Sequence, residues 1–203
     1  MSVPGPVLVT GFEPFDGRPV NASWAAVEAL VAAWSGPERL VAVRLPVSFR
    51  GARQVLRLAV REHGPSVVVC VGEAARPLVG VERVAVNVID ARIADNDGSA
   101  PVDVPVVAGA PAAFFATLPV RACAQAVAAA GVPVEVSPSA GTYVCNATFY
   151  ALAHLLADRP GVRAGFVHVP LMPDQAGQGE PSLTTARAAV ALGAVVRTAL
   201  DHP

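Results

Sequence analysis

The feature that most constrains the fold is an alternation of short apolar runs with segments of helical pattern. The clearest run, SVVVCV at 66–71, contains no charged residue and ends at Gly72. Such a run is typical of a strand that is buried on both faces of a parallel sheet. Because similar runs recur between helical segments, the sequence predicts an α/β protein. We expect a three-layer α/β/α fold around a mixed, largely parallel twisted sheet.

The expected elements follow from the spacing of apolar residues and from the Gly and Pro residues that interrupt it. In the first helix, for example, Trp24, Val27 and Val31 recur at helical spacing. The expected strands are 7–10, 40–45, 66–71, 83–88, 133–137 and 164–169. The expected helices are 22–34, 51–63, 119–130, 145–158 and 182–200, the last with Ser182 as its N-cap.

The connection between the strands expected at 66–71 and 83–88 departs from this alternation. It is short and rich in Gly, Pro and Ala, which suits a turn better than a crossover helix. We therefore expect strand 83–88 to run antiparallel to strand 66–71. Glu82, just before strand 83–88, then lies at the rim where the parallel strands end, which is the rim where sheets of this type bind ligands.

Composition and charge exclude several classes of protein. Hydrophobic residues make up 53% of the 203 residues and charged residues 15%, which is too apolar for a disordered chain and suits one domain over residues 1–203. The net charge of −1 provides no basic field for nucleic acid or an anionic membrane, so neither is an expected partner. The low charge agrees with a surface that a second subunit partly covers.

Apolar segments also bear on location. The segment MSVPGPVLVTGF at 1–12 has no basic start and no long apolar stretch, so we expect no signal peptide. No apolar run reaches the about 20 residues of a membrane-spanning helix. These features predict a cytoplasmic protein whose three cysteines are reduced thiols. The cysteines form no CxxC pair of the kind that binds zinc, and no metal or other cofactor is expected.

Cys145 differs from the other two cysteines in its surroundings. It follows the small and polar residues of SAGTYV and opens an expected helix. Free N–H groups at a helix N-terminus stabilise a thiolate, lower the thiol pKa and can hold an oxyanion. Cys70 lies in an apolar strand and Cys123 in an Ala-rich helix, so both are expected to be structural. The alternative for Cys145 is a core position on the buried face of its helix.

His168 interrupts the apolar strand GFVHVP near its carboxyl end. One interpretation is a base for Cys145, and the other is a packed or surface histidine. A Cys–His pair also needs an acceptor for the second ring nitrogen. Topology favours Glu82 without selecting it, because the acids expected on this rim are Glu13, Asp16, Glu73, Glu82, Asp90 and Asp95.

Two further motifs carry little functional information. TGFEPFDG at 10–17 lacks the GxGxxG pattern and the lysine of nucleotide-binding loops. DNDG at 95–98 lacks the downstream glutamate of a calcium loop, and we interpret it as a turn.

Five segments, taken together and in order, resemble the pyroglutamyl-peptidase I family, also called pyrrolidone-carboxylate peptidases. The resemblance extends over residues 7–199 and is most specific in the cysteine and HVP segments. The segments are VLVTGFEPFDGRPVNAS at 7–23, GVERVAVNVIDARIADNDG at 80–98, FFATLPVRA at 114–122, SAGTYVCNATFY at 139–150 and AGFVHVPLMPDQ at 164–175.

This resemblance implies a cysteine peptidase that hydrolyses the N-terminal pyroglutamyl (5-oxoprolyl) residue from peptides through a thioester intermediate on Cys145. The family's triad falls on Cys145, His168 and Glu82, and it uses no metal. Peptides with N-terminal pyroglutamate are the implied partners, and a homodimer or homotetramer is the implied assembly.

The resemblance also assigns pocket residues. Phe12 and Phe15 match the phenylalanines of the family's substrate pocket, Asn21 matches an asparagine that helps bind the lactam, and Arg92 matches an arginine near the oxyanion site. The other matched pocket positions are Val47, Ile93, Tyr143 and Val144.

Two residues depart from the family pattern. Asp16 stands where the family often has Gly, and Glu73 where it often has Gln. Glu73 can accept a hydrogen bond from the lactam N–H, but it cannot donate one unless it is protonated. The alternatives to a pyroglutamyl peptidase are an amidase of other lactam-bearing metabolites and a non-enzymatic binding protein on the same fold.

Overall fold

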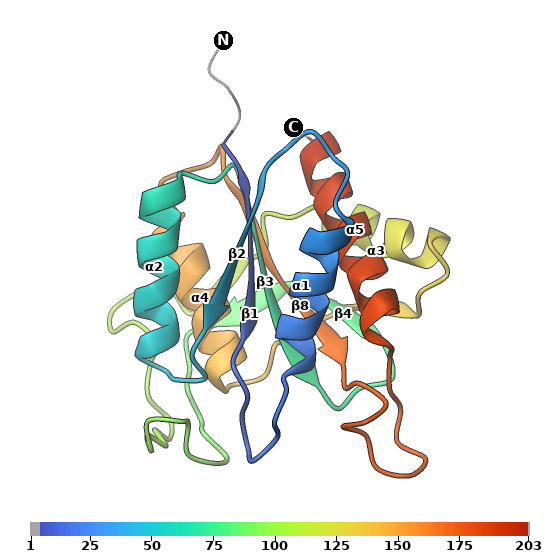
Figure 1. Ribbon diagram of the computed structural model, residues 1–203. Coiled ribbons are helices and arrows are strands. Elements are labelled where there is room, and N and C mark those ends of the chain that lie inside the picture. Colours follow the sequence, from blue (N-terminus) through green and yellow to red (C-terminus); the bar gives the residue numbers. More distant parts are fainter. Residues whose placement is uncertain (1–4, 203) are drawn as a thin grey trace.

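The structure, a computed structural model, describes residues 5–202, so the first four residues of the N-terminal segment lie outside the described part. Its centre is a six-stranded sheet with helices on both faces (Figure 1). The strands, in their order across the sheet, are β2 (Leu40–Leu45), β1 (Val7–Phe12), β3 (Val67–Ala74), β8 (Arg163–Pro170), β4 (Val79–Glu82) and β7 (Val134–Ser137). This architecture confirms the predicted three-layer fold with a mixed, mostly parallel sheet.

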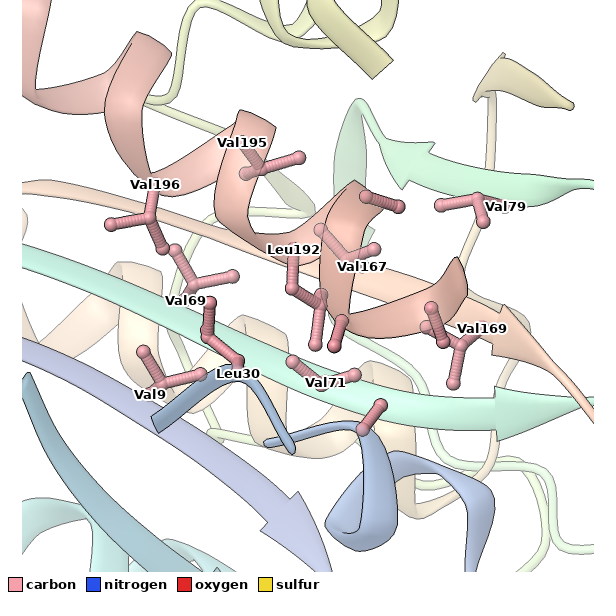
Figure 2. Packing of buried hydrophobic residues seen from close by; sticks show 14 of the residues in the cluster. Val9, Leu30, Val69, Val71, Val79, Val167, Val169, Leu192, Val195 and Val196 are labelled. Atoms are coloured by element: carbon pink, nitrogen blue, oxygen red, sulfur yellow. The ribbon is translucent and has the colours of Figure 1, made fainter. Parts of the chain in front are cut away.

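The helices divide between the two faces of the sheet, as Figure 1 shows. One face is covered by α1 (Ala22–Ala33), α3 (Val120–Ala129) and α5 (Thr185–Asp201), and the other by α2 (Gly51–His63) and α4 (Val144–Leu155). Figure 2 shows Leu192, Val195 and Val196 of α5 packed on the central strands. Their valine partners on β3 and β8 are Val69, Val71, Val167 and Val169.

Strand β3 is buried on both faces, as its sequence predicts. Val67, Val69 and Val71 belong to the core on the α1 and α5 side, whereas Val68 and Cys70 belong to the core on the α2 and α4 side. The alternation of side chains along a strand explains this division. β3 continues past Gly72 to Ala74, because β8 pairs with it over all eight residues.

The strand expected at 83–88 is wrong in its bounds and in its neighbours. In VGVERVAV the alternation of apolar residues changes phase at the adjacent charged residues Glu82 and Arg83. The structure divides the segment there into β4, which ends at Glu82, and β5 (Val84–Val86). β5 leaves the main sheet and pairs with β6 (Ala113–Phe115), a strand that the sequence analysis missed. The main sheet does contain an antiparallel strand in this region, but it is β4 rather than 83–88. β4 is antiparallel to β8, which is parallel to β3. β8 lies between β3 and β4, so these two strands are not neighbours.

The start of the last helix is also corrected. α5 begins at Thr185 with Thr184 as its N-cap, whose side chain accepts a hydrogen bond from the Arg187 N–H. Ser182 precedes the helix in a segment without regular secondary structure. No helix within residues 5–202 is both long and apolar enough to cross a membrane.

Candidate active site

Cys145 and His168 both lie at the rim formed by the carboxyl ends of the parallel strands. Cys145 is the second residue of α4, and His168 lies near the end of β8. Both line a pocket of about 330 Å³. The same pocket is lined by every residue predicted to bind substrate, namely Phe12, Phe15, Asn21, Val47, Glu73, Arg92, Ile93, Tyr143 and Val144. Residues far apart in the sequence therefore converge at one rim, although their contacts with a substrate stay predictions.

Glu82 lies behind His168, away from the pocket lining. Its Oε1 atom is 2.7 Å from His168 Nδ1, and both side chains are buried. Of the six acids expected on the rim, Glu82 is the one that contacts the imidazole. Arg76 Nη1 lies 3.0 Å from the same Oε1 atom. Glu82 Oε2 is buried and has no hydrogen-bond partner among the described residues.

Two glycines flank His168 in the sheet, Gly72 of β3 and Gly80 of β4. A Cβ atom on Gly72 would lie 2.8 Å from Cys145 Sγ, which is shorter than real contacts of this kind. A Cβ atom on Gly80 would lie 3.2 Å from Glu82 Oε1. The missing side chains on both neighbouring strands therefore leave room for the thiol on one side of His168 and for the carboxylate on the other.

The thiol of Cys145 is less acidic than the sequence analysis expects. Burial, together with the nearby charges of Glu82 and Glu73, raises the pKa of the Cys145 thiol to about 12, although Arg76 acts to lower it. The residue as a whole is partly exposed, but protein atoms surround the sulfur. The expected lowering by the helix N-terminus is thus overcome by desolvation and by two carboxylates. At neutral pH the resting thiol is protonated, so it requires a base before it can attack.

Aromatic side chains form one wall of the pocket. The ring centroids of Phe15 and Tyr143 are 5.7 Å apart, and Phe49 packs edge-on against Tyr143 from behind. The Tyr143 hydroxyl donates to the Ala94 carbonyl at 3.0 Å, which fixes the ring. Phe12 is the last residue of β1 and is almost fully buried, so it forms part of the floor rather than of a turn.

Asn21 is engaged in a helix cap. Its Oδ1 atom accepts from the Ser23 N–H at 3.0 Å and from Ser23 Oγ at 2.7 Å. Its Nδ2 atom donates to the Glu13 carbonyl at 3.0 Å. An amide nitrogen carries two hydrogens, so one N–H of Asn21 is left to meet a ligand.

Glu73 is similarly engaged at the pocket edge. Its Oε1 atom pairs with Arg18 Nη1 at 3.0 Å, and its Oε2 atom accepts from the Ala22 N–H at 2.7 Å and from Gln175 Nε2 at 3.1 Å. The sequence analysis missed Arg18 and Gln175, because these residues lie in two separate loops, Glu73 lies on β3, and no local pattern marks the link between them. Whether Glu73 also accepts from a lactam stays a prediction.

Two further rim acids, Glu13 and Asp95, make structural contacts. Glu13 Oε1 accepts from the Val47 N–H at 3.1 Å and from Asn96 Nδ2 at 2.7 Å. Asp95 is buried, and its carboxylate accepts from the N–H groups of Phe49, Asp97 and Ser99. These bonds fold DNDG into the turn that the sequence predicts.

Comparison with known proteins agrees with this geometry. A family model described as pyroglutamyl peptidase matches residues 6–202. The pyrrolidone-carboxylate peptidase of Clavibacter michiganensis is 50% identical over 97% of this chain and 93% of its own length. That of Cupriavidus necator is 49% identical over 96% of this chain and 93% of its own.

Solved structures show the same relationship. The crystal structure of pyroglutamyl peptidase I from Bacillus amyloliquefaciens has a TM-score of 0.93 and 40% identity, and the match covers 98% of each chain. The pyrrolidone carboxyl peptidase from Thermococcus litoralis has a TM-score of 0.92 and 37% identity, and the match covers 98% of this chain and 94% of the relative.

Proposed function

This chain belongs to the pyroglutamyl peptidase family, and from that membership we propose that Cys145, His168 and Glu82 carry out its reaction. The reaction is hydrolysis of the amide bond that follows an N-terminal pyroglutamyl residue of a peptide. The observation that supports the triad best is the buried 2.7 Å contact between His168 Nδ1 and Glu82 Oε1, beside a pocket that Cys145 also lines.

The contact with Glu82 determines how His168 works. A carboxylate at Nδ1 holds the tautomer in which Nδ1 carries the proton, which leaves Nε2 free to accept one. The Cys145 sulfur attacks the pyroglutamyl carbonyl while its proton passes to Nε2. The imidazolium then gives that proton to the departing amine, and a thioester remains on Cys145. Water, activated by the same nitrogen, hydrolyses the thioester, releases pyroglutamate and restores the thiol.

The start of α4 is suited to stabilise the oxyanion. The first N–H groups of a helix have no partner within the helix, and Tyr143 provides no side-chain cap for them. We propose that the N–H groups of Val144 and Cys145 meet the developing negative charge, a contribution of about 3 kcal/mol per donor.

The pocket walls support selectivity for a lactam. Pyroglutamate is a compact neutral ring, and Phe15, Tyr143 and Ile93 provide an apolar wall of the corresponding kind. An open-chain glutamyl residue would bring an ammonium and a carboxylate into this space. Burial of an unpaired charge costs several kcal/mol, so we expect glutamyl amides to be rejected by at least about a thousandfold.

A neutral chromogenic pyroglutamyl anilide tests the proposal. We expect hydrolysis by the wild-type protein, inhibition by thiol alkylation, and a loss of at least about a thousandfold in Cys145→Ser, because an alcohol is a poorer nucleophile for this base. Cys123→Ser is the matched control and should keep the chemistry. Near-full activity of Cys145→Ser, or equal kcat/KM for glutamyl and pyroglutamyl anilides, would contradict the proposal.

A further inference from the structure

The ionisable side chain of Glu82 is fully buried. All of its contacts are made by one of its two carboxylate oxygens. His168 Nδ1 and Arg76 Nη1 both contact Oε1, at 2.7 and 3.0 Å, whereas Oε2 has no partner among residues 5–202. A buried carboxylate in this state is costly unless a positive charge compensates it. In the resting enzyme His168 is the base and is neutral in the proposed mechanism, so Arg76 is the permanent cation in contact with Glu82.

Arg76 is held in place from several sides. Its Nη1 atom also donates to Ser137 Oγ at 3.2 Å, and its Nη2 atom donates to the Ser139 carbonyl at 3.4 Å. Gly80 leaves the guanidinium its space, because a Cβ atom there would lie 3.3 Å from Nη1. The side chain is only 30% exposed and lines the pocket, so it extends from the solvent edge to the buried carboxylate.

From this geometry we propose that Arg76 is a positioning residue of the triad. It acts through Glu82 in two ways. Its charge compensates that of the buried carboxylate, and its bond to Oε1 fixes the rotation of the carboxylate so that this oxygen faces His168 Nδ1. The inference rests on the proposed function, and it adds a fourth member, contributed by the loop after β3, to the three residues named above.

The sign of the pH effect follows from the charges around Glu82. The charged or titratable groups near it are His168 on β8, Arg76 on the loop after β3 and Cys145 on α4. β7 contributes the uncharged Ser137. Removal of the arginine cation makes it easier for the His168–Glu82 pair to gain a proton, wherever in the pair the proton resides. A protonated pair cannot act as base, so the acid limb of the kcat/KM profile should move to higher pH.

The test uses Arg76→Met, which keeps the length of the side chain and removes its charge. On the neutral anilide we expect kcat near pH 7 to fall roughly 10–100-fold, the range seen when the hydrogen-bond partner behind a working residue is lost. KM should stay within about twofold, since Arg76 contacts no substrate atom in this proposal. The acid limb should move up by about one pH unit.

Two further variants sharpen the result. Arg76→Lys keeps the positive charge but lacks the planar, two-pronged guanidinium, so we expect a smaller shift of the acid limb in the same direction. This variant replaces Arg76→Met in the test if Arg76→Met does not fold. Arg83→Met is the matched control, because Arg83 is the sequence neighbour of Glu82 and is not among its contacts. Its acid limb should coincide with that of the wild-type protein.

Several outcomes would overturn the inference. A uniform loss of kcat in Arg76→Met with an unshifted acid limb would indicate a merely structural role. A raised KM that is confined to a pyroglutamyl dipeptide with a free carboxylate would indicate that Arg76 binds the substrate instead. A wild-type protein that does not cleave the anilide refutes the proposed function, whereas an active wild type with an unaffected Arg76→Met refutes only the role of Arg76.

Discussion

At the scale of single residues, the three cysteines differ because of what surrounds each sulfur. Cys70 and Cys123 are fully buried, whereas Cys145 is partly exposed at the pocket. Burial raises the pKa of Cys70 to about 12 and that of Cys123 to about 11. These two thiols therefore pack as small apolar side chains, and they link the stability of the fold to alkaline pH.

That link gives a prediction for Cys70. Thiols of the unfolded chain ionise from about pH 9 upward, while the folded chain keeps Cys70 protonated to about pH 12. The folded state then holds the extra proton, so the free energy of unfolding should fall as pH rises, by roughly 1.4 kcal/mol per pH unit for this thiol. Urea unfolding from pH 8 to 11 should show a shallower fall in Cys70→Ala. Parallel curves for the variant and the wild type would contradict this.

Gly72 gives a second prediction at this scale. In Gly72→Ala the new methyl group would lie 2.8 Å from Cys145 Sγ and 3.0 Å from the Phe166 ring. We expect the thiol to be displaced and kcat on the pyroglutamyl anilide to fall about a hundredfold, since small misplacements of a reacting group have effects of that order. Gly161→Ala is the control, because nothing lies within 4 Å of the position of its Cβ. Equal activity of the two variants would refute the crowding argument.

The residue scale also shows how far the sequence predicts the site. Cys145 and His168 stand out by position, one opening a helix and the other interrupting an apolar strand near its end. The acid partner does not stand out, because six acids share the rim. Glu82 reaches His168 because β4 pairs with β8 in a register that places Gly80 opposite His168. This register depends on tertiary packing, which the sequence pattern does not reveal. Arg76 and the raised pKa of Cys145 depend on the same three-dimensional surroundings.

At the scale of elements, the helices and strands of the parallel core follow their sequence patterns closely. Strand 40–45 and helix 51–63 have the predicted bounds, since Pro46 and Gly64 end them. The segment after β3 differs from the single strand expected at 83–88. The alternation in VGVERVAV changes phase at Glu82 and Arg83, and the two halves belong to different sheets. Alternation of apolar residues predicts strand conformation, but it does not predict which neighbouring strand each part of the segment pairs with.

The cap of α5 gives an element-scale prediction. Thr184 accepts from the Arg187 N–H, whereas Ser182 lies outside the helix. Thr184→Ala should therefore lower the free energy of unfolding by about 0.5–1 kcal/mol. Ser182→Ala, its matched control, should leave it nearly unchanged. Thermal or urea unfolding checks both variants. A larger effect of Ser182→Ala would contradict the prediction and support Ser182 as the N-cap.

At the scale of the whole molecule, the predicted homodimer or homotetramer is still to be measured. Large apolar side chains are exposed on the chain described here, with Phe115 71% exposed, Val102 63% and Leu58 59%. Such residues are typical of surfaces that another subunit covers, although single exposed apolar residues also occur on monomers. We expect light scattering at micromolar concentration to show a dimer or tetramer. A stable monomer would refute this prediction.

The position of β8 has a consequence for biosynthesis. β8 is the last strand in the sequence, yet it lies in the middle of the sheet, between β3 and β4. Until the ribosome has released residues 163–170, the sheet exists at most as two separate pieces, each with an open edge that can pair with another chain. Insertion of β8 closes both edges and delivers His168 in the same step. A nascent chain that lacks β8 therefore has neither a continuous sheet nor the histidine that we propose as the base for Cys145.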